Sequence, residues 1–229
     1  MTNAAPAQPA VSANAEMAVE VRSLRYAYAQ QVALALEHFA LARGVSSAIM
    51  GPSGCGKSTF VHLLAGLLTP EAGSIHILGQ DLSLLNESQR DRFRGRHIGF
   101  VFQRLHLMPA LSIRENIALA QRLARAPRDT QRIDDILETL GLADMRHRRP
   151  RELSQGQAQR AAIARALVHE PELVIADEPT SALDDDHAAE ALGLLQRTAT
   201  ASGAALLVVT HDDRVRGKLD GEFAMEVPA

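Results

Sequence analysis

The sequence predicts an α/β fold in which helices cover both faces of a parallel sheet. The stretches 172–177 (ELVIAD) and 205–211 (ALLVVTH) are continuous apolar runs, as expected for strands that are buried on both faces. A third stretch, 44–50 (GVSSAIM), reads as a strand that runs directly into a glycine-rich turn. Helical patterns lie between these runs, and strands that alternate with helices typically form one parallel sheet.

The other elements follow from the same patterns. Further strands are predicted at 19–28, 73–79 and 97–102, and helices at 58–68 and 186–200. Between about 104 and 168 the pattern changes: 112–124 opens with a capping box of Ser112 and Glu115, and 129–141 ends at a glycine. Several helices without strands indicate a helical insert in the α/β core.

Composition indicates an ordinary globular protein, with 46% hydrophobic and 22% charged residues. A net charge of −3 gives no basic footprint for nucleic acid, and the single cysteine excludes an intramolecular disulfide. We expect residues 1–17, which are rich in Ala, Pro and Asn, to form a disordered tail, and 18–229 to form a single domain. No stretch approaches the roughly 20 apolar residues that cross a bilayer, so a membrane role needs a separate membrane partner.

The stretch GPSGCGKST (51–59) predicts a phosphate-binding loop, because it fits G-x-x-x-x-G-K-[ST] between a predicted strand and a helix. Its glycines permit a tight backbone whose N–H groups point at phosphate oxygens. Lys57, one of only two lysines, would reach the β- and γ-phosphates, and Ser58 would bind Mg²⁺. Cys55 is interpreted as a small side chain rather than a nucleophile. A glycine-rich turn with a chance lysine is the weaker alternative.

An acidic pair follows the apolar strand at 173–176. Asp177 stands where a buried strand ends, which is where Mg²⁺ needs a second ligand. The adjacent Glu178 could polarise a water molecule for attack on the γ-phosphate. A solvated acidic turn is the plainer explanation, and the phosphate loop makes it less favoured.

The stretch RELSQGQAQR (151–160) contains no metal-ligand cluster and no nucleophile–base pair. Ser154 and Gln157 form a capping box, so a well-capped helix explains it. A helix N-terminus with a serine hydroxyl and Gly156 is also an anion site. Because the helical insert separates it from the phosphate loop, a phosphate bound there would belong to a second subunit.

Taken in order, these motifs resemble those of the ATP-binding cassette (ABC) ATPases over about residues 19–212. GPSGCGKST is similar to the Walker A motif, Gln103 in FVFQ to the Q-loop, and LSQGQ (153–157) to the family signature. LVIADEP resembles the Walker B motif, SALD (181–184) the D-loop, and His211 in VVTHD the switch histidine. Each motif is modest alone, and six in sequence are not expected by chance.

The resemblance implies a P-loop NTPase (RecA-like) core with a small antiparallel β subdomain and an α-helical subdomain at about 104–168. It also implies that two cassettes pair head to tail and enclose two ATP molecules. Each phosphate loop would then face the partner's copy of the signature. That copy would contribute Ser154, Gly156 and Gln157.

The resemblance also implies roles for single residues. Glu178 would be the general base, with His211 and Lys57 at the γ-phosphate and Asp184 across the dimer interface. Mg²⁺ would be held by Ser58, Gln103 and Asp177. Tyr28 would stack on adenine, although YAYAQQ lacks the glycine that is common after this aromatic residue. The other nucleotide contacts would come from Gly51, Ser53, Gly54, Cys55, Gly56 and Thr59.

Two further departures put little function in doubt: Gln155 replaces a glycine in the signature, and GVS stands at 44–46 where Gly-Glu is typical. The stretch 90–119 resembles the subgroup of lipoprotein-releasing, macrolide-efflux and cell-division ATPases. We therefore expect a cytoplasmic subunit on the inner face of the membrane, bound to a permease. The ATPase subunit of a small-molecule importer would share every motif, so this alternative function remains. A soluble family member that acts on DNA or ribosomes is disfavoured by the weak positive charge.

Overall fold

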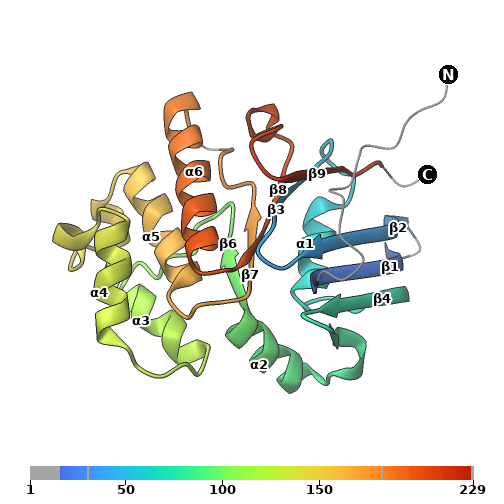
Figure 1. The fold of residues 1–229 in the computed structure, drawn as a ribbon, viewed down its shortest axis with the longest axis horizontal. Coiled ribbons are helices and arrows are strands. Elements are labelled where there is room, and N and C mark those ends of the chain that lie inside the picture. The colour runs from blue at the N-terminus through green and yellow to red at the C-terminus, as the bar shows by residue number, and fades with distance from the viewer. Residues whose placement is uncertain (1–15, 30, 182, 228–229) are drawn as a thin grey trace.

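The computed structural model describes residues 16–29, 31–181 and 183–227, which form two sheets surrounded by helices (Figure 1). Most of the predicted tail, residues 1–15, lies outside the described part. The first sheet is four-stranded and antiparallel, in the order β2-β1-β4-β5. Its strands are β1 (Met17–Tyr28), β2 (Gln31–Ala42), β4 (Ala72–Ile77) and β5 (Gln80–Asp81).

The second sheet has five strands in the order β6-β7-β8-β3-β9, and every pair in it is parallel. Its strands are β3 (Ser46–Met50), β6 (Ile98–Val101), β7 (Leu173–Asp177), β8 (Ala205–Thr210) and β9 (Gly221–Ala224). The predicted α/β class with a parallel sheet is therefore confirmed. Because the strands are parallel, the loops that follow their carboxyl ends meet at one edge of the sheet.

Helices cover both faces of this parallel sheet (Figure 1). Helix α1 packs between the two sheets, whereas α3, α5 and α6 lie on the opposite face. The helices are α1 (Lys57–Leu64), α2 (Glu87–His97), α3 (Ile113–Leu123), α4 (Thr130–Thr139), α5 (Gln155–Leu167) and α6 (Asp185–Ala201). Short 3₁₀ turns lie at Leu82–Leu84, Ala143–Met145, Pro150–Glu152 and Asp213–Val215. Within the described residues from 103 to 171 there are helices and turns but no strand.

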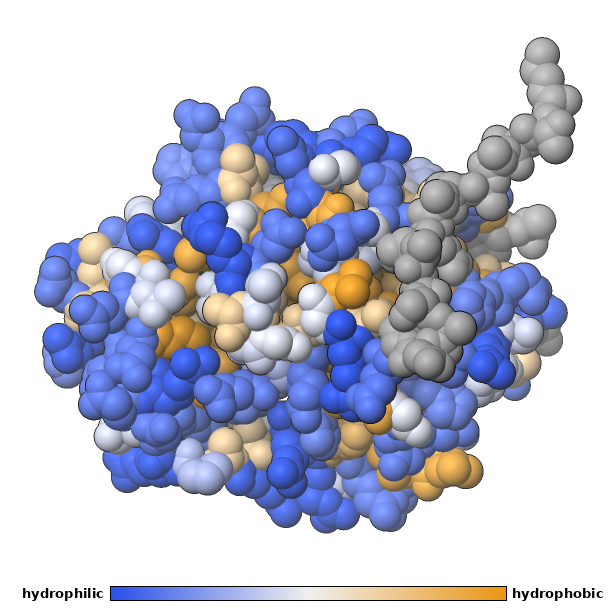
Figure 2. Space-filling view, viewed as in Figure 1, coloured by the Kyte–Doolittle hydropathy of each residue, from blue (hydrophilic) through white to orange (hydrophobic). Residues whose placement is uncertain are grey.

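The apolar strands are buried because their side chains alternate between two cores. Leu173 and Ile175 of β7 enter the core between the two sheets, and Val174 and Ala176 enter the core beneath α3–α6. This alternation explains why these strands are apolar without interruption. Hydrophilic side chains cover most of the face seen in Figure 2. Among the described helices, none has the length and apolar character to cross a bilayer.

Candidate functional site

A cavity of about 480 Å³ opens where the loops after β3, β6, β7 and β8 meet the turn between β1 and β2. It brings together residues that lie far apart in the sequence, most of which the motifs singled out. The lining residues are Tyr28, Gln31, Val32, Ala33, Ser53, Gly54, Gly56, Lys57, Ser58, Thr59, Gln103, Glu178 and His211.

The phosphate loop has a conformation that requires glycine. Gly56 has φ +98°, and a Cβ added there would lie 2.4 Å from the carbonyl oxygen of Ala33 in β2. Cys55 is fully buried, and a Cβ at Gly51 would lie 2.6 Å from its Sγ. The thiol therefore packs inside the protein, and the described lining of the cavity includes neither Cys55 nor Gly51, both of which the sequence predicts as nucleotide contacts.

Lys57 is the first residue of α1, and its ammonium group folds back across the loop. Its Nζ donates to the carbonyl oxygens of Gly51 (2.7 Å) and Pro52 (2.9 Å). Gly56, the N-cap, provides no side-chain hydrogen bond to the helix. The first N–H groups of α1 and the Lys57 ammonium thus create a positive region at the cavity wall, which suits a phosphate group.

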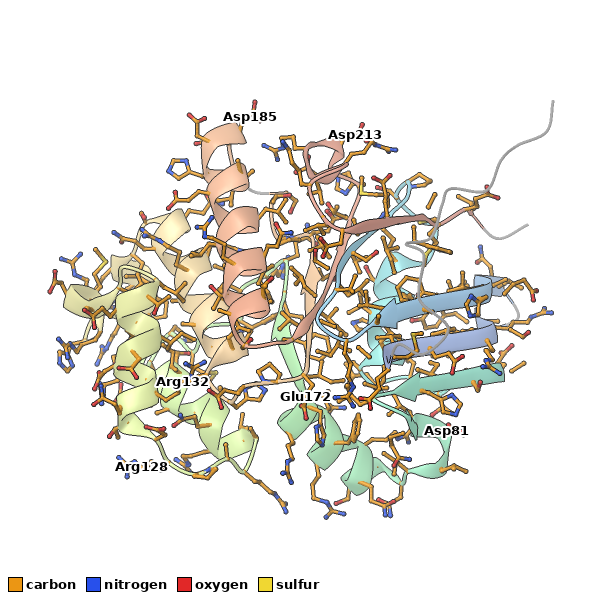
Figure 3. The ribbon with its side chains drawn as sticks, viewed as in Figure 1. Asp81, Arg128, Arg132, Glu172, Asp185 and Asp213 are labelled. Atoms are coloured by element: carbon orange, nitrogen blue, oxygen red, sulfur yellow. The ribbon has the colours of Figure 1, made fainter. Side chains whose placement is uncertain are left out.

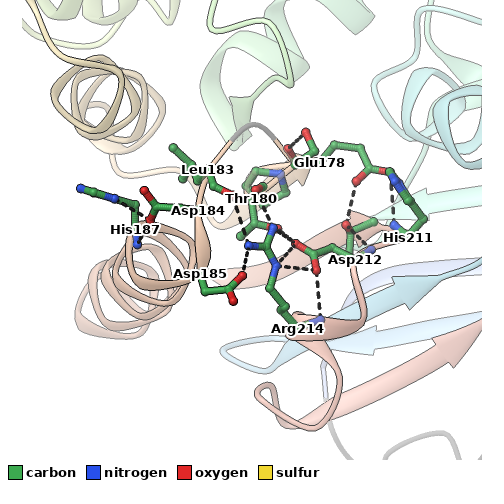
Figure 4. Close-up of polar contacts among 12 residues, drawn as sticks. Glu178, Thr180, Leu183, Asp184, Asp185, His187, His211, Asp212 and Arg214 are labelled. Atoms are coloured by element: carbon green, nitrogen blue, oxygen red, sulfur yellow. Dashed lines mark hydrogen bonds and ion pairs between the residues drawn. The ribbon is translucent and has the colours of Figure 1, made fainter.

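Glu178 and His211 form a close pair at the ends of β7 and β8 (Figure 4). His211 Nδ1 lies 2.6 Å from Glu178 Oε1, and the Thr210 hydroxyl donates to Glu178 Oε2 at 2.7 Å. The Glu178 side chain is only 10% exposed, whereas His211 is 53% exposed. Glu178 lines the cavity and has a φ of 49°, a strained backbone conformation for a residue other than glycine. Sequence reasoning missed Thr210.

Asp177 is the last residue of β7 and has an unfavourable environment for a negative charge. Burial raises the pKa of its carboxyl group, the adjacent Glu178 raises it further, and His62 and Lys57 oppose the shift. Such a carboxylate is stabilised by a nearby cation. Ser58 and Gln103 line the cavity with neutral oxygen donors, a combination that suits Mg²⁺. Within the described chain, no cluster of three or more His, Cys, Asp or Glu side chains could hold a metal ion.

The signature segment lies elsewhere. Ser154 is the exposed N-cap of α5, its Oγ accepts from the Gln157 backbone N–H (3.3 Å), and Gln157 Oε1 accepts from the Ser154 N–H (2.9 Å). The predicted capping box is therefore present. Among the described residues, those that line the cavity do not include 154–157. A Cβ at Gly156 would instead lie 3.6 Å from the ring of His187 in α6.

Asp184 also lies outside the cavity lining, at the N-cap of α6. Its Oδ1 accepts from the His187 N–H (3.0 Å) and lies 2.7 Å from His187 Nδ1. These hydrogen bonds lower the pKa of the Asp184 carboxyl group and raise that of His187. Both side chains are exposed, so they are available to a partner.

Tyr28 lines the cavity and is 49% exposed, as a ring that stacks on a base requires. Its edge-to-face partner is Tyr26, at 4.9 Å between ring centroids. Sequence reasoning missed Gln31, Val32 and Ala33 of β2, which continue this wall. No motif marks them, because they reach the site only through the pairing of β1 with β2.

Comparison with known proteins finds a matching family profile and related sequences. The ABC transporter family profile matches residues 36–181. The lipoprotein-releasing system ATP-binding protein LolD of Hydrogenovibrio crunogenus is 42% identical over 189 residues, which cover 82% of each chain. LolD of Psychrobacter arcticus is 43% identical over 186 residues, which cover 80% of this chain and 82% of that protein.

Solved structures share the fold. The dimeric ATP-binding cassette MJ0796, bound to ADP and Pi, superposes with a TM-score of 0.80 at 31% identity, covering 92% of this chain and 97% of that chain. The cassette cbiO1 of Clostridium perfringens, part of the cbiONQ transporter complex, has a TM-score of 0.84 at 30% identity, covering 93% and 88% of the two chains.

Proposed function

This chain belongs to the ABC transporter family, and from that premise we propose that it is the ATP-hydrolysing subunit of a membrane transporter of the lipoprotein-releasing type. One observation carries the proposal: a single cavity combines the phosphate loop around Lys57 with the Glu178–His211 pair. The domain is 18–229, with the helical region at about 104–168 as a subdomain within it.

The proposed roles follow from the positions of the residues that line the cavity and of Asp177, which ends β7 and is not in the described lining. The triphosphate would lie along the glycine-rich loop, with Lys57 at its β- and γ-phosphates and the adenine against Tyr28. Mg²⁺ would be held by Ser58, Gln103 and Asp177, and it would neutralise the phosphate charge. Glu178 would accept a proton from the attacking water, since its carboxylate is oriented by Thr210 and His211. The exposed His211 ring would also contact the γ-phosphate.

A second copy of the chain completes the site in this proposal. Ser154, Gly156 and Gln157 do not line the cavity of their own chain, yet they lie at the start of a helix that can bind an anion. The dimeric cassette MJ0796 is a structural precedent for such pairing. Two chains arranged head to tail would therefore share two ATP molecules, with Asp184 at the interface.

A separate groove supports a permease partner. A cavity of about 600 Å³ lies among α1, α2, α3 and the loop after β6, and Leu67, Met108 and Leu123 line it with exposed apolar side chains. The loop is held in place by Asn116, which accepts from the Met108 N–H (2.7 Å), and by Arg165, which donates to the His106 carbonyl (2.7 Å). A helix from a membrane subunit fits such a groove, and it would hold the chain at the inner face of the membrane.

The test uses Glu178→Gln. The variant keeps the shape of the carboxylate but cannot take a proton, so it should bind ATP, hydrolyse it at least about a hundredfold more slowly, and accumulate as a dimer. Light scattering after gel filtration with MgATP measures the dimer, and phosphate release measures hydrolysis.

Glu172→Gln is the matched control, because Glu172 precedes the same strand and contacts His97 at 3.0 Å. Figure 3 shows Glu172 at the end of the sheet opposite Asp185 and Asp213. The control should behave like the wild-type protein. Wild-type hydrolysis by Glu178→Gln would refute the assigned base, and a monomeric, ATP-bound variant would refute the shared site.

A further inference from the structure

Arg214 connects two loops that leave the catalytic end of the parallel sheet (Figure 4). It lies in the turn at Asp213–Val215, after β8, and its guanidinium group contacts the loop that follows β7. On its own side it donates to Asp212, from Nε at 2.9 and 3.0 Å and from Nη2 at 2.8 Å. Toward the segment after β7 it donates to the carbonyls of Leu183 and Thr180, both at 3.2 Å, and to the Asp185 carboxylate at 2.8 Å.

These contacts use every donor that the guanidinium group has. Nε carries one proton, and each of the two Nη atoms carries two. Nε is directed at the Asp212 carboxylate, Nη1 has two acceptors, and Nη2 also has two. A lysine ammonium has three donors on one atom, and it cannot reproduce this planar arrangement.

The groups that Arg214 holds are next to the proposed catalytic residues. Asp212 follows His211 directly, and Thr180 and Leu183 lie between Glu178 and Asp184. The Thr180 hydroxyl also donates to Asp212 Oδ2 at 2.6 Å, and Thr180 is 1% exposed. The segments after β7 and β8 are thus joined at two places: by the Glu178–His211 pair in the cavity, and outside it by the contacts of Arg214 and Asp212 with Thr180, Leu183 and Asp185.

Arg214 acts from outside the nucleotide cavity. The described lining of the nucleotide cavity does not include Arg214. Arg214 instead lines a second cavity, beside α6, together with Leu192 and Val215. Its removal therefore deletes no predicted contact with ATP. What its removal deletes is the set of contacts from the segment after β8 to Thr180, Leu183 and Asp185.

We propose that Arg214 is a positioning residue for ATP hydrolysis: it fixes Thr180, Leu183 and Asp185 against the His211–Asp212 segment, and so keeps Glu178, His211 and Asp184 in the arrangement that hydrolysis and pairing require. This inference rests on the proposed function. Arg214 would then contribute to kcat and to dimer formation, but not to the affinity of a single chain for ATP.

The experiment compares Arg214→Lys with Arg216→Lys, which changes the same residue type in the same segment. Arg216 is exposed and contacts only Asp213 and Glu222 among the described residues, each at 3.1 Å. Both purified variants are assayed for kcat and KM of ATP hydrolysis, for the Kd of a fluorescent ATP analogue, and for the thermal midpoint. Each substitution is also combined with Glu178→Gln to measure ATP-dependent dimer formation.

We expect Arg214→Lys to lower kcat about tenfold, to leave KM and Kd within about twofold, and to reduce the dimer fraction, while Arg216→Lys changes none of these. A kcat within about twofold of wild type, or a Kd that weakens as much as kcat falls, overturns the inference. So does a kcat that returns to the wild-type value when the assay temperature lies well below the thermal midpoint, since that result describes a residue that only stabilises the fold. If the wild-type protein does not hydrolyse ATP, the proposed function fails instead.

Discussion

Asp177 is a residue whose position opposes the stability of the folded chain. Its carboxyl group has a raised pKa because burial and the adjacent Glu178 disfavour the negative charge. At neutral pH the folded state carries this charge at a cost in free energy that the unfolded state does not have. A position that costs stability is typical of a residue kept for its function.

We therefore predict that Asp177→Asn raises the thermal midpoint of the nucleotide-free protein at pH 7, although it removes Mg²⁺-dependent hydrolysis. Because the folded pKa is raised, the stability penalty develops as pH rises through the ordinary value of 3.8, and it is absent below that value. The difference in midpoint between variant and wild type should thus shrink as pH falls toward 3.8.

Differential scanning calorimetry at several pH values measures this difference. Asp144→Asn, which changes an exposed carboxylate in the helical region, is the control and should show no such trend. A midpoint for Asp177→Asn below wild type at pH 7 would mean that attraction to Lys57 outweighs burial, and the prediction would fail.

Glycine is required in the phosphate loop for two reasons, a positive φ and close packing, and a comparison of Gly56 with Gly54 distinguishes them. Both have positive φ, +98° and +85°, but a Cβ at Gly56 would lie 2.4 Å from the Ala33 carbonyl oxygen, whereas a Cβ at Gly54 would have no neighbour within 4 Å. Both alanine variants should lose stability through backbone strain. We predict that Gly56→Ala loses about 1–3 kcal/mol more, because β2 must move away. Urea unfolding measures both, and equal losses would contradict the packing argument.

At the scale of elements, a substitution can separate the capping role of the start of α5 from its proposed role in pairing. Ser154 caps the helix, and the Asn86–Gln89 capping box at α2 is a matched structure elsewhere. We predict that Ser154→Arg and Asn86→Arg cost a similar amount, about 1 kcal/mol each. Only Ser154→Arg should abolish hydrolysis, because it would block the interface with the second copy.

Phosphate release and binding of a fluorescent ATP analogue measure these effects. ATP binding to the single chain should survive in both variants, since the described lining of the cavity does not include Ser154. Loss of binding in Ser154→Arg would show that the segment serves its own phosphate loop or the fold, and not a partner.

The elements also show which features the sequence reveals. Strands β7 and β8 are predictable because both their faces are buried, which leaves a continuous apolar run. Strand β2 is not, because it lies at the sheet edge and mixes buried with exposed positions. Helix α2 has no buried residue and hence no apolar period.

The candidate site also contains parts that a local sequence pattern reveals and parts that it does not. The phosphate loop is contiguous in sequence and is therefore recognisable as a motif. The wall at 31–33 and the Arg214 contacts arise only when distant segments meet, and no local pattern records them. Sequence patterns thus locate the residues proposed to react, while the residues proposed to orient them can be found only from the fold.

At the scale of the whole molecule, the proposed ATP site and the proposed permease groove are joined through one strand and its loop. Strand β6 leads to Gln103, which lines the ATP cavity, and the chain then continues to Met108, which lines the groove. Arg165 of α5 holds this loop through the His106 carbonyl, and Ser154 is the N-cap of the same helix. A movement of α5 on pairing would therefore reach the groove through the loop.

If the groove binds a permease, its exposed apolar side chains should be needed at the membrane and not for hydrolysis. Leu123 is 71% exposed and lines the groove, whereas Leu84 is 77% exposed and lies outside its described lining. We predict that Leu123→Glu lowers the fraction of the protein that sediments with membranes of its own cells at least about tenfold, because a charge there would be desolvated on docking. Leu84→Glu should leave that fraction unchanged, and both purified variants should hydrolyse ATP like wild type. Equal retention of the two variants would place the permease contact elsewhere on the molecule. A parallel loss of hydrolysis in Leu123→Glu would instead mean that the groove serves the fold or the ATP site.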